Sequence, residues 1–223
     1  FVKHNGELVY LGPDVKEDPQ IAAVIGGYEK EMGPELQRII GKTEIFLDGG
    51  RYSIRSGKDT NLGRLITHLM ANYAKSDAAV INGGGIRESI KEGDITMSDV
   101  FTVLPFSNIV VKMDLTGEDL QKVLQFSHDL EPGSGGKLQT FGIVYSADNG
   151  RVTIESVHGK KIDSSAVYSL ATNDFLAAGG DGYTILKDRG KNCYNYAEQV
   201  SDLLIDFVKH NPVITQYLID RLK

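Results

Sequence analysis

Helix and strand patterns alternate along the first part of the sequence, and strands dominate after about residue 140. An amphipathic helix is predicted after a cap at Asp59 or Thr60, because apolar residues recur there at helical spacing: Leu62, Leu65, Ile66, Leu69, Met70 and Tyr73. Short strands are predicted at 43–47, 78–81 and 109–113. Alternation followed by a hairpin is typical of an α+β domain, with a mixed sheet and flanking helices, and does not suit a regular doubly wound fold.

The second half of the chain carries the clearest local signals. Asp148-Asn149-Gly150 predicts a tight hairpin between strands at 141–146 and 151–156. Thr116 predicts the start of a helix, and a further strand is expected at 167–171. A last long helix is expected over 196–209, stopped by Asn211-Pro212 and followed by a short helical tail.

The N-terminal part suggests a segment separate from the main domain. We interpret residues 1–17, with a short strand at 7–11, as the end of an upstream segment or a linker strand. Asp18-Pro19 predicts the start of a connector helix over 18–41, with a kink or two segments caused by its internal glycines and Pro34. The main domain then spans 42–223. Because the sequence shows neither an initiator Met nor a leader peptide, we interpret the chain as a fragment or a processed product.

Composition excludes several classes of function. Of the 223 residues, 41% are hydrophobic and 24% charged, as in ordinary globular proteins, and no apolar run reaches the ~18 residues that a membrane span needs. A net charge of −6 argues against binding a nucleic-acid polymer. The lone Cys193 rules out an intrachain disulfide and zinc held by paired thiolates, and leaves the redox compartment open.

The sequence shows no hydrolytic machinery of its own. Its five histidines are scattered, none at metal-ligand spacing, and no Gly-x-Ser-x-Gly turn is present. We therefore expect neither a catalytic residue nor a metal site in this chain.

The remaining polar candidates suit an anion. Arg51 and Arg55 are four residues apart, so they fall on the same side of a helix or strand and could grip a phosphate, although spacing alone favours two solvated surface arginines. Arg87 follows the run Gly83–Gly85 at a strand end, where it could bind a ligand or make a structural ion pair.

Two phenylalanines and one aspartate suit a nucleoside. Phe106 and Phe175 flank turns, where each could fill the core or stack on a base. Asp181 lies between glycines, where it could form a turn or accept hydrogen bonds from ribose hydroxyls.

Arg87, Phe106, Phe175 and Asp181 lie in motifs that resemble a known family, and a further such motif follows Arg51 and Arg55. Four motifs occur in order, Thr60–Ile66, Asn82–Arg87, Pro105-Phe106 and Asn173–Tyr183, within a resemblance that covers about residues 20–210. Together they resemble the C-terminal domain of the 5′-nucleotidase / UDP-sugar hydrolase family. The segment Pro132–Gly136 lies outside these motifs, and we assign it no role.

The resemblance implies a substrate-binding domain with a 5′-nucleotidase C-terminal-domain-like fold. Phe106 and Phe175 would clamp the base, Arg51, Arg55 and Arg87 would hold the phosphate, and Asp181 the ribose. Asn82 and Asn108 would lie at or near the base. Phe at both clamp positions favours a 5′-nucleotidase over the related 3′-nucleotidases and 2′,3′-cyclic phosphodiesterases, and a non-enzymatic nucleotide-binding module remains the second alternative.

The same resemblance implies a partner domain that the sequence does not contain. Two divalent metal ions are expected in an N-terminal metallophosphoesterase domain of the same protein, to which this domain would deliver an AMP-like nucleotide or a UDP-sugar for hydrolysis. The family also implies nucleotide catabolism and an extracytoplasmic location, periplasmic or at the cell surface. This chain alone is expected to be inactive.

Overall fold

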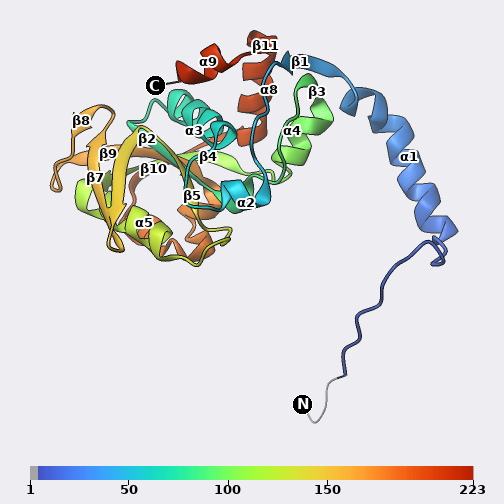
Figure 1. Cartoon of the computed structure of the whole chain (residues 1–223), viewed down its shortest axis with the longest axis horizontal. Helices are drawn as coiled ribbons and strands as arrows, with labels where there is room; N and C mark the ends of the chain where they lie inside the picture. The colour runs from blue at the N-terminus through green and yellow to red at the C-terminus, as the bar shows by residue number, and fades with distance from the viewer. Residues whose placement is uncertain (1–4, 223) are drawn as a thin grey trace. The chain divides into compact units, whose positions relative to one another are not determined.

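The computed structural model describes residues 5–222, and it divides the chain into two compact units, residues 1–37 and 38–223 (Figure 1). The first four residues of the predicted 1–17 segment, and the final residue of the predicted 42–223 domain, lie outside the described range.

The N-terminal unit contains one helix, α1 (Pro19–Leu36). Asp18 caps it as predicted, because its carboxylate accepts hydrogen bonds from the N–H groups of Gln20 and Ile21. The helix is one element rather than two, since Gln37 N–H donates to Gly33 O and resumes the hydrogen-bond ladder after Pro34. No residue of α1 is buried, although its apolar positions follow helical spacing.

The predicted strand at 7–11 was wrong. These residues are exposed and have no strand assignment, since a strand requires a neighbour to accept and donate its hydrogen bonds, and none pairs with them in the described part of the chain.

The C-terminal unit is an α+β domain, as predicted, and its described residues form three sheets (Figure 1). The central sheet has the order β10-β4-β9-β2-β5, with β2 and β9 parallel and the other pairs antiparallel. The other sheets have the orders β11-β1-β3 and β6-β7-β8. The strands are β1 (Ile39–Thr43), β2 (Ala78–Asn82), β3 (Gly93–Thr96), β4 (Ile109–Thr116), β5 (Leu138–Phe141), β6 (Ile143–Asp148), β7 (Arg151–Val157), β8 (Lys160–Lys161), β9 (Val167–Asn173), β10 (Lys191–Gln199) and β11 (Val213–Ile214).

Helices cover both faces of the central sheet, so two hydrophobic cores form. They are α2 (Arg51–Ile54), α3 (Asn61–Ala74), α4 (Met97–Val103), α5 (Gly117–Asp129), α6 (Asp174–Ala177), α7 (Thr184–Arg189), α8 (Val200–His210) and α9 (Gln216–Asp220), with 3₁₀ turns η1 (Gly83–Gly85) and η2 (Gly180–Gly182). Strand β2 shows the separation, because Ala79 and Ile81 pack in the core under α3 and α8 while Ala78 and Val80 pack in the core under α5. This alternation follows from the two-residue period of a strand.

Several sequence predictions are confirmed. Thr60, rather than Asp59, caps α3, since its hydroxyl accepts from Gly63 N–H, and Thr116 caps α5 in the same way. The β6–β7 hairpin turns at Asn149 and Gly150, whose φ angles of 48° and 78° give the turn type that Asn-Gly favours.

Three boundaries were wrong. Residues 39–41 belong to β1 instead of the connector helix, and Gly41 packs so closely on Val208 that a Cβ would lie 2.6 Å from its Cγ1. The strand predicted at 43–47 therefore begins and ends earlier in the chain, as β1. Leu47 makes only an isolated β-bridge to Ile90. The helix predicted from residue 196 begins at Val200, because 191–199 form the edge strand β10.

Candidate functional site

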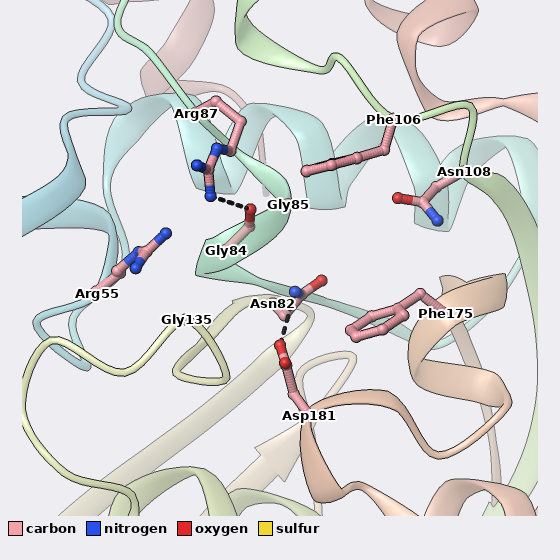
Figure 2. A pocket seen from close by; sticks show the side chains of 10 residues that line it. All are labelled: Arg55, Asn82, Gly84, Gly85, Arg87, Phe106, Asn108, Gly135, Phe175 and Asp181. Atoms are coloured by element: carbon pink, nitrogen blue, oxygen red, sulfur yellow. Dashed lines mark hydrogen bonds between the residues drawn. The ribbon is translucent and has the colours of Figure 1, made fainter. Parts of the chain in front are cut away.

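A pocket of about 360 Å³ lies at one edge of the central sheet (Figure 2). Its volume is typical of small-ligand sites. Ten residues line it: Arg55, Asn82, Gly84, Gly85, Arg87, Phe106, Asn108, Gly135, Phe175 and Asp181.

The parallel strands β2 and β9 place much of this lining. Both strands end at the same edge of the sheet, with Asn82 as the last residue of β2 and Asn173 as the last residue of β9. The glycines of η1 follow the first strand and α6 follows the second, so loops far apart in the sequence meet here. Such strand ends are common binding crevices.

Two phenylalanine rings face the pocket from opposite sides (Figure 2). Phe106 is 48% exposed and Phe175 is 42% exposed, so neither ring fills the core. The guanidinium carbon of Arg87 lies 5.9 Å from the centre of the Phe106 ring, within cation–π range. The Phe175 ring lies against Gly180, where a Cβ would come within 2.6 Å of three ring atoms. Both rings are therefore available to a ligand in the pocket.

The pocket carries positive charge at one end. Arg55 is only 8% exposed, and its Nε has no hydrogen-bond partner among the described residues. Burial lowers the pKa of Arg55 from its usual value, as do the charges of Arg51 and Arg87, whereas Asp181 raises it. Arg87 is exposed, and its Nη1 lies 3.3 Å from Gly84 O. Buried guanidinium groups require an anion or other acceptors, so this end of the pocket suits a phosphate.

Asp181 is held by a chain of amides. Asn82 Nδ2 donates to Asp181 Oδ2 at 2.9 Å, and Asn173 Nδ2 donates to Asn82 Oδ1 at 3.1 Å. Asn173 Oδ1 in turn accepts from Leu176 N–H and caps α6. Asp181 has a φ of 53°, the left-handed conformation that Asp adopts more readily than most residues, so the sequence prediction of a turn is also satisfied. Asn82 thus donates one Nδ2 hydrogen and accepts at Oδ1, and Asp181 Oδ1 accepts no hydrogen bond from the residues that the structure describes.

Gly135 lines the pocket although the sequence analysis assigned no role to its segment. Gly84 N–H donates to Gly135 O, and Gly83 N–H donates to Lys137 O, both at 2.7 Å. A Cβ on Gly84 would lie 3.2 Å from Gly135 O, so glycine permits this close approach of the two chain segments. The glycine run itself was the only sequence signal for this contact.

The structure brings together most of the residues that the sequence singled out. Arg55, Asn82, Arg87, Phe106, Asn108, Phe175 and Asp181 all line the one pocket. Arg51 does not line it, since it is exposed on α2 and affects the site through its charge on Arg55.

Residues 5–222 offer no metal centre of their own. This range contains no cluster of three or more His, Cys, Asp or Glu side chains that could hold a metal ion. It also contains no helix long and apolar enough to cross a bilayer.

The α+β fold places arginines and two aromatic rings around one pocket, a lining that suits a small ligand with a flat ring and negative charge. The family model "5′-nucleotidase, C-terminal domain" matches residues 39–188. The chain therefore belongs to the 5′-nucleotidase C-terminal domain family.

Known relatives agree with this assignment. Protein UshA of Escherichia coli K12 is 34% identical over 82% of this chain and 33% of its own length. A 5′-nucleotidase of Vibrio cholerae is 33% identical over 96% of this chain and 38% of its own length. The crystal structure of a 5′-nucleotidase precursor from Thermus thermophilus superposes with a TM-score of 0.76 and 31% identity, over 89% of this chain and 41% of the other. The chain thus spans between about a third and two fifths of the length of these relatives.

Proposed function

We propose that this chain is the substrate-binding domain of a metal-dependent 5′-nucleotidase. One observation carries the proposal: a single pocket joins two facing aromatic rings to a buried guanidinium whose Nε lacks a partner among the described residues. Stacking is insensitive to which base is present, and an anion satisfies a buried guanidinium well, so a nucleotide suits both parts.

In this proposal each end of the nucleotide has its own residues. The base lies between Phe106 and Phe175. The phosphate is held by Arg55 and Arg87, with Arg51 adding positive charge beside Arg55. The ribose hydroxyls bind the free oxygen of Asp181. Asn82 acts by fixing that carboxylate and does not contact the base.

The chemistry of hydrolysis is assigned to another domain. The described residues do not fit a metal pair, because no cluster of metal-binding side chains is present among them. We propose that an N-terminal metallophosphoesterase domain of the same protein holds two divalent ions and activates water, that this chain presents the phosphate to it, and that the whole protein works outside the cytoplasm in nucleotide catabolism.

The phosphate assignment is tested by calorimetric titration of this chain with AMP and with adenosine. Arg55→Ala should weaken AMP binding by about 10- to 100-fold, because a hydrogen bond to a charged group contributes ~1.5–3 kcal/mol, and should change adenosine binding far less. Arg189→Ala, an exposed arginine of α7 away from the lining residues, is the matched control. Equal losses for AMP and adenosine would contradict the assignment.

The division of labour is tested by phosphate release. The purified chain, mixed with AMP and Mg²⁺, Mn²⁺, Co²⁺ or Zn²⁺ in turn, should bind nucleotide without hydrolysing it. Metal-dependent turnover that persists after further purification would show an active centre within these residues.

A further inference from the structure

Asn108 presents a single acceptor to the space between the two rings. It lies directly before β4, and its Nδ2 donates to Asp174 Oδ1 at 2.8 Å. Figure 2 shows its carboxamide oxygen on the pocket side, in the gap between Phe106 and Phe175. The oxygen therefore faces the place proposed for the base.

Asp174 determines which way this carboxamide points. The same Asp174 Oδ1 also accepts from the N–H groups of Phe175 at 3.0 Å and Ile109 at 3.3 Å. A carboxylate held by two backbone donors can only accept. Turning the Asn108 amide over would bring two acceptors together, so the orientation follows from the hydrogen-bond network.

We propose that Asp174 is a positioning residue that aims the Asn108 oxygen at the base, and that this one acceptor sets base selectivity. The inference rests on the proposed nucleotide-binding function. Adenine and cytosine carry an exocyclic amine on their pairing edge, and guanine and uracil carry a ring N–H there. One acceptor between two stacking rings thus admits all four bases.

The same acceptor rejects flat rings that lack such a donor. A base without an N–H would cover the Asn108 oxygen and leave it without a hydrogen bond, which is costly. Sites built around a hydrogen bond discriminate strongly against analogues that lack the matching group. The pocket is therefore permissive among natural bases and selective against donorless ones.

Calorimetric titration of the chain with adenosine and with purine riboside tests this inference. The second compound has the same ring system without the 6-amino group. The wild type should bind adenosine about tenfold more tightly. Asn108→Ala and Asp174→Ala should both bring this ratio close to one by weakening adenosine binding, with purine riboside little changed. Asp174→Asn should restore part of the ratio, because its amide oxygen can replace Oδ1. Asp188→Ala, an exposed aspartate of α7, is the matched control.

The outcomes separate this inference from the proposed function. A wild-type ratio near one, with both nucleosides bound, would overturn the inference and leave the proposed function standing. If folded Asp174→Ala keeps the wild-type preference for adenosine over purine riboside, the positioning role is overturned. If no nucleoside binds, the proposed function and the inference both fail. If Asp174→Ala does not fold, NMR of the wild type decides: one Asn108 carboxamide proton should exchange slowly with water, and two fast ones would overturn the positioning role.

Discussion

The two sides of the pocket support their aromatic rings in different ways. We call Arg87, Phe106 and Asn108 the Phe106 wall, and Phe175 with Asp181 the Phe175 wall. The Phe106 ring has the long side chain of Arg87 beside it, whereas the Phe175 ring rests on the main chain at Gly180. A side chain with several rotatable bonds can follow a ring that moves, and a main-chain support cannot. The two rings thus differ in their support, with a flexible side chain beside Phe106 and main chain beside Phe175.

In each wall, the polar side chain that faces the pocket is fixed by a hydrogen bond with a residue outside that wall. One wall presents the asparagine of an Asn–Asp pair to the pocket, and the other wall presents the aspartate. Asp174 holds Asn108 on the Phe106 wall, and Asn82 holds Asp181 on the Phe175 wall. The same Asn–Asp pair therefore exposes an amide oxygen on one side and a carboxylate oxygen on the other. The residue that meets the ligand cannot be recognised from its type alone.

Asp181→Ala should give the largest effect on binding, because it removes the charged member of the Phe175 wall. We expect adenosine affinity to fall about 10- to 100-fold, as for other hydrogen bonds to a charged group. The affinity of 2′,3′-dideoxyadenosine, which lacks the hydroxyls, should change little. Calorimetry measures both, and equal losses would contradict the ribose contact.

Asn82→Ala should act mainly on stability. It leaves Asn173 Nδ2 without its acceptor in a buried position, so we expect the free energy of unfolding to fall by about 1–3 kcal/mol. Urea denaturation measures this loss. Adenosine affinity should fall less than in Asp181→Ala, and the double variant should bind no worse than Asp181→Ala alone, because the two residues share one interaction. Additive losses would assign Asn82 a ligand contact of its own.

Gly180→Ala should displace the Phe175 ring without unfolding the chain. The added methyl group would meet the far end of the ring, which can rotate away. Adenosine affinity should fall about fivefold to tenfold, within the ~1–3 kcal/mol that stacking on one ring contributes. Thermal denaturation checks the fold, and an unchanged affinity would show that the ring position is not critical.

Arg87→Gln should have the smallest effect on nucleoside binding. The cation–π contact at an exposed site contributes only ~0.5–1 kcal/mol, so adenosine affinity should fall about twofold to fivefold. AMP affinity should fall further, because the guanidinium also meets the phosphate. A loss for adenosine that exceeds the loss in Gly180→Ala would reverse the comparison of the two walls.

Elements with strong local signals were predictable from the sequence. The hairpin at Asn149-Gly150 and the caps at Thr60 and Thr116 depend on interactions within a few residues. The edge strand β10 was missed because left-handed residues at Asn192 and Ala197 interrupt its two-residue pattern. Tertiary pairing, rather than local propensity, also places β1 where a helix was expected.

The parts of the candidate site that are formed by side chains were predictable from the sequence. The parts that are formed by the main chain were not. Seven predicted residues line one pocket, and all but Arg55 lie close to the edge where β2 and β9 end and β4 begins. Gly135 was missed, since its carbonyl contact with Gly84 leaves no trace in residue type beyond glycine itself. The hydrogen-bond partners of Asn82 and Asn108 could not be predicted from the sequence. These hydrogen bonds join residues more than 60 positions apart, and such bonds have no sequence signature.

The irregular backbone of β10 also affects the tendency of the protein to aggregate. As the outermost strand of the central sheet, β10 would offer its unused backbone groups to any extended polypeptide nearby, a familiar route to aggregation. Its register shifts twice, and the N–H of Ala197 is taken by the side chain of Asn195. A straight foreign strand cannot match this irregular spacing. The irregular backbone that made this strand hard to predict from the sequence thus also disfavours strand pairing between molecules.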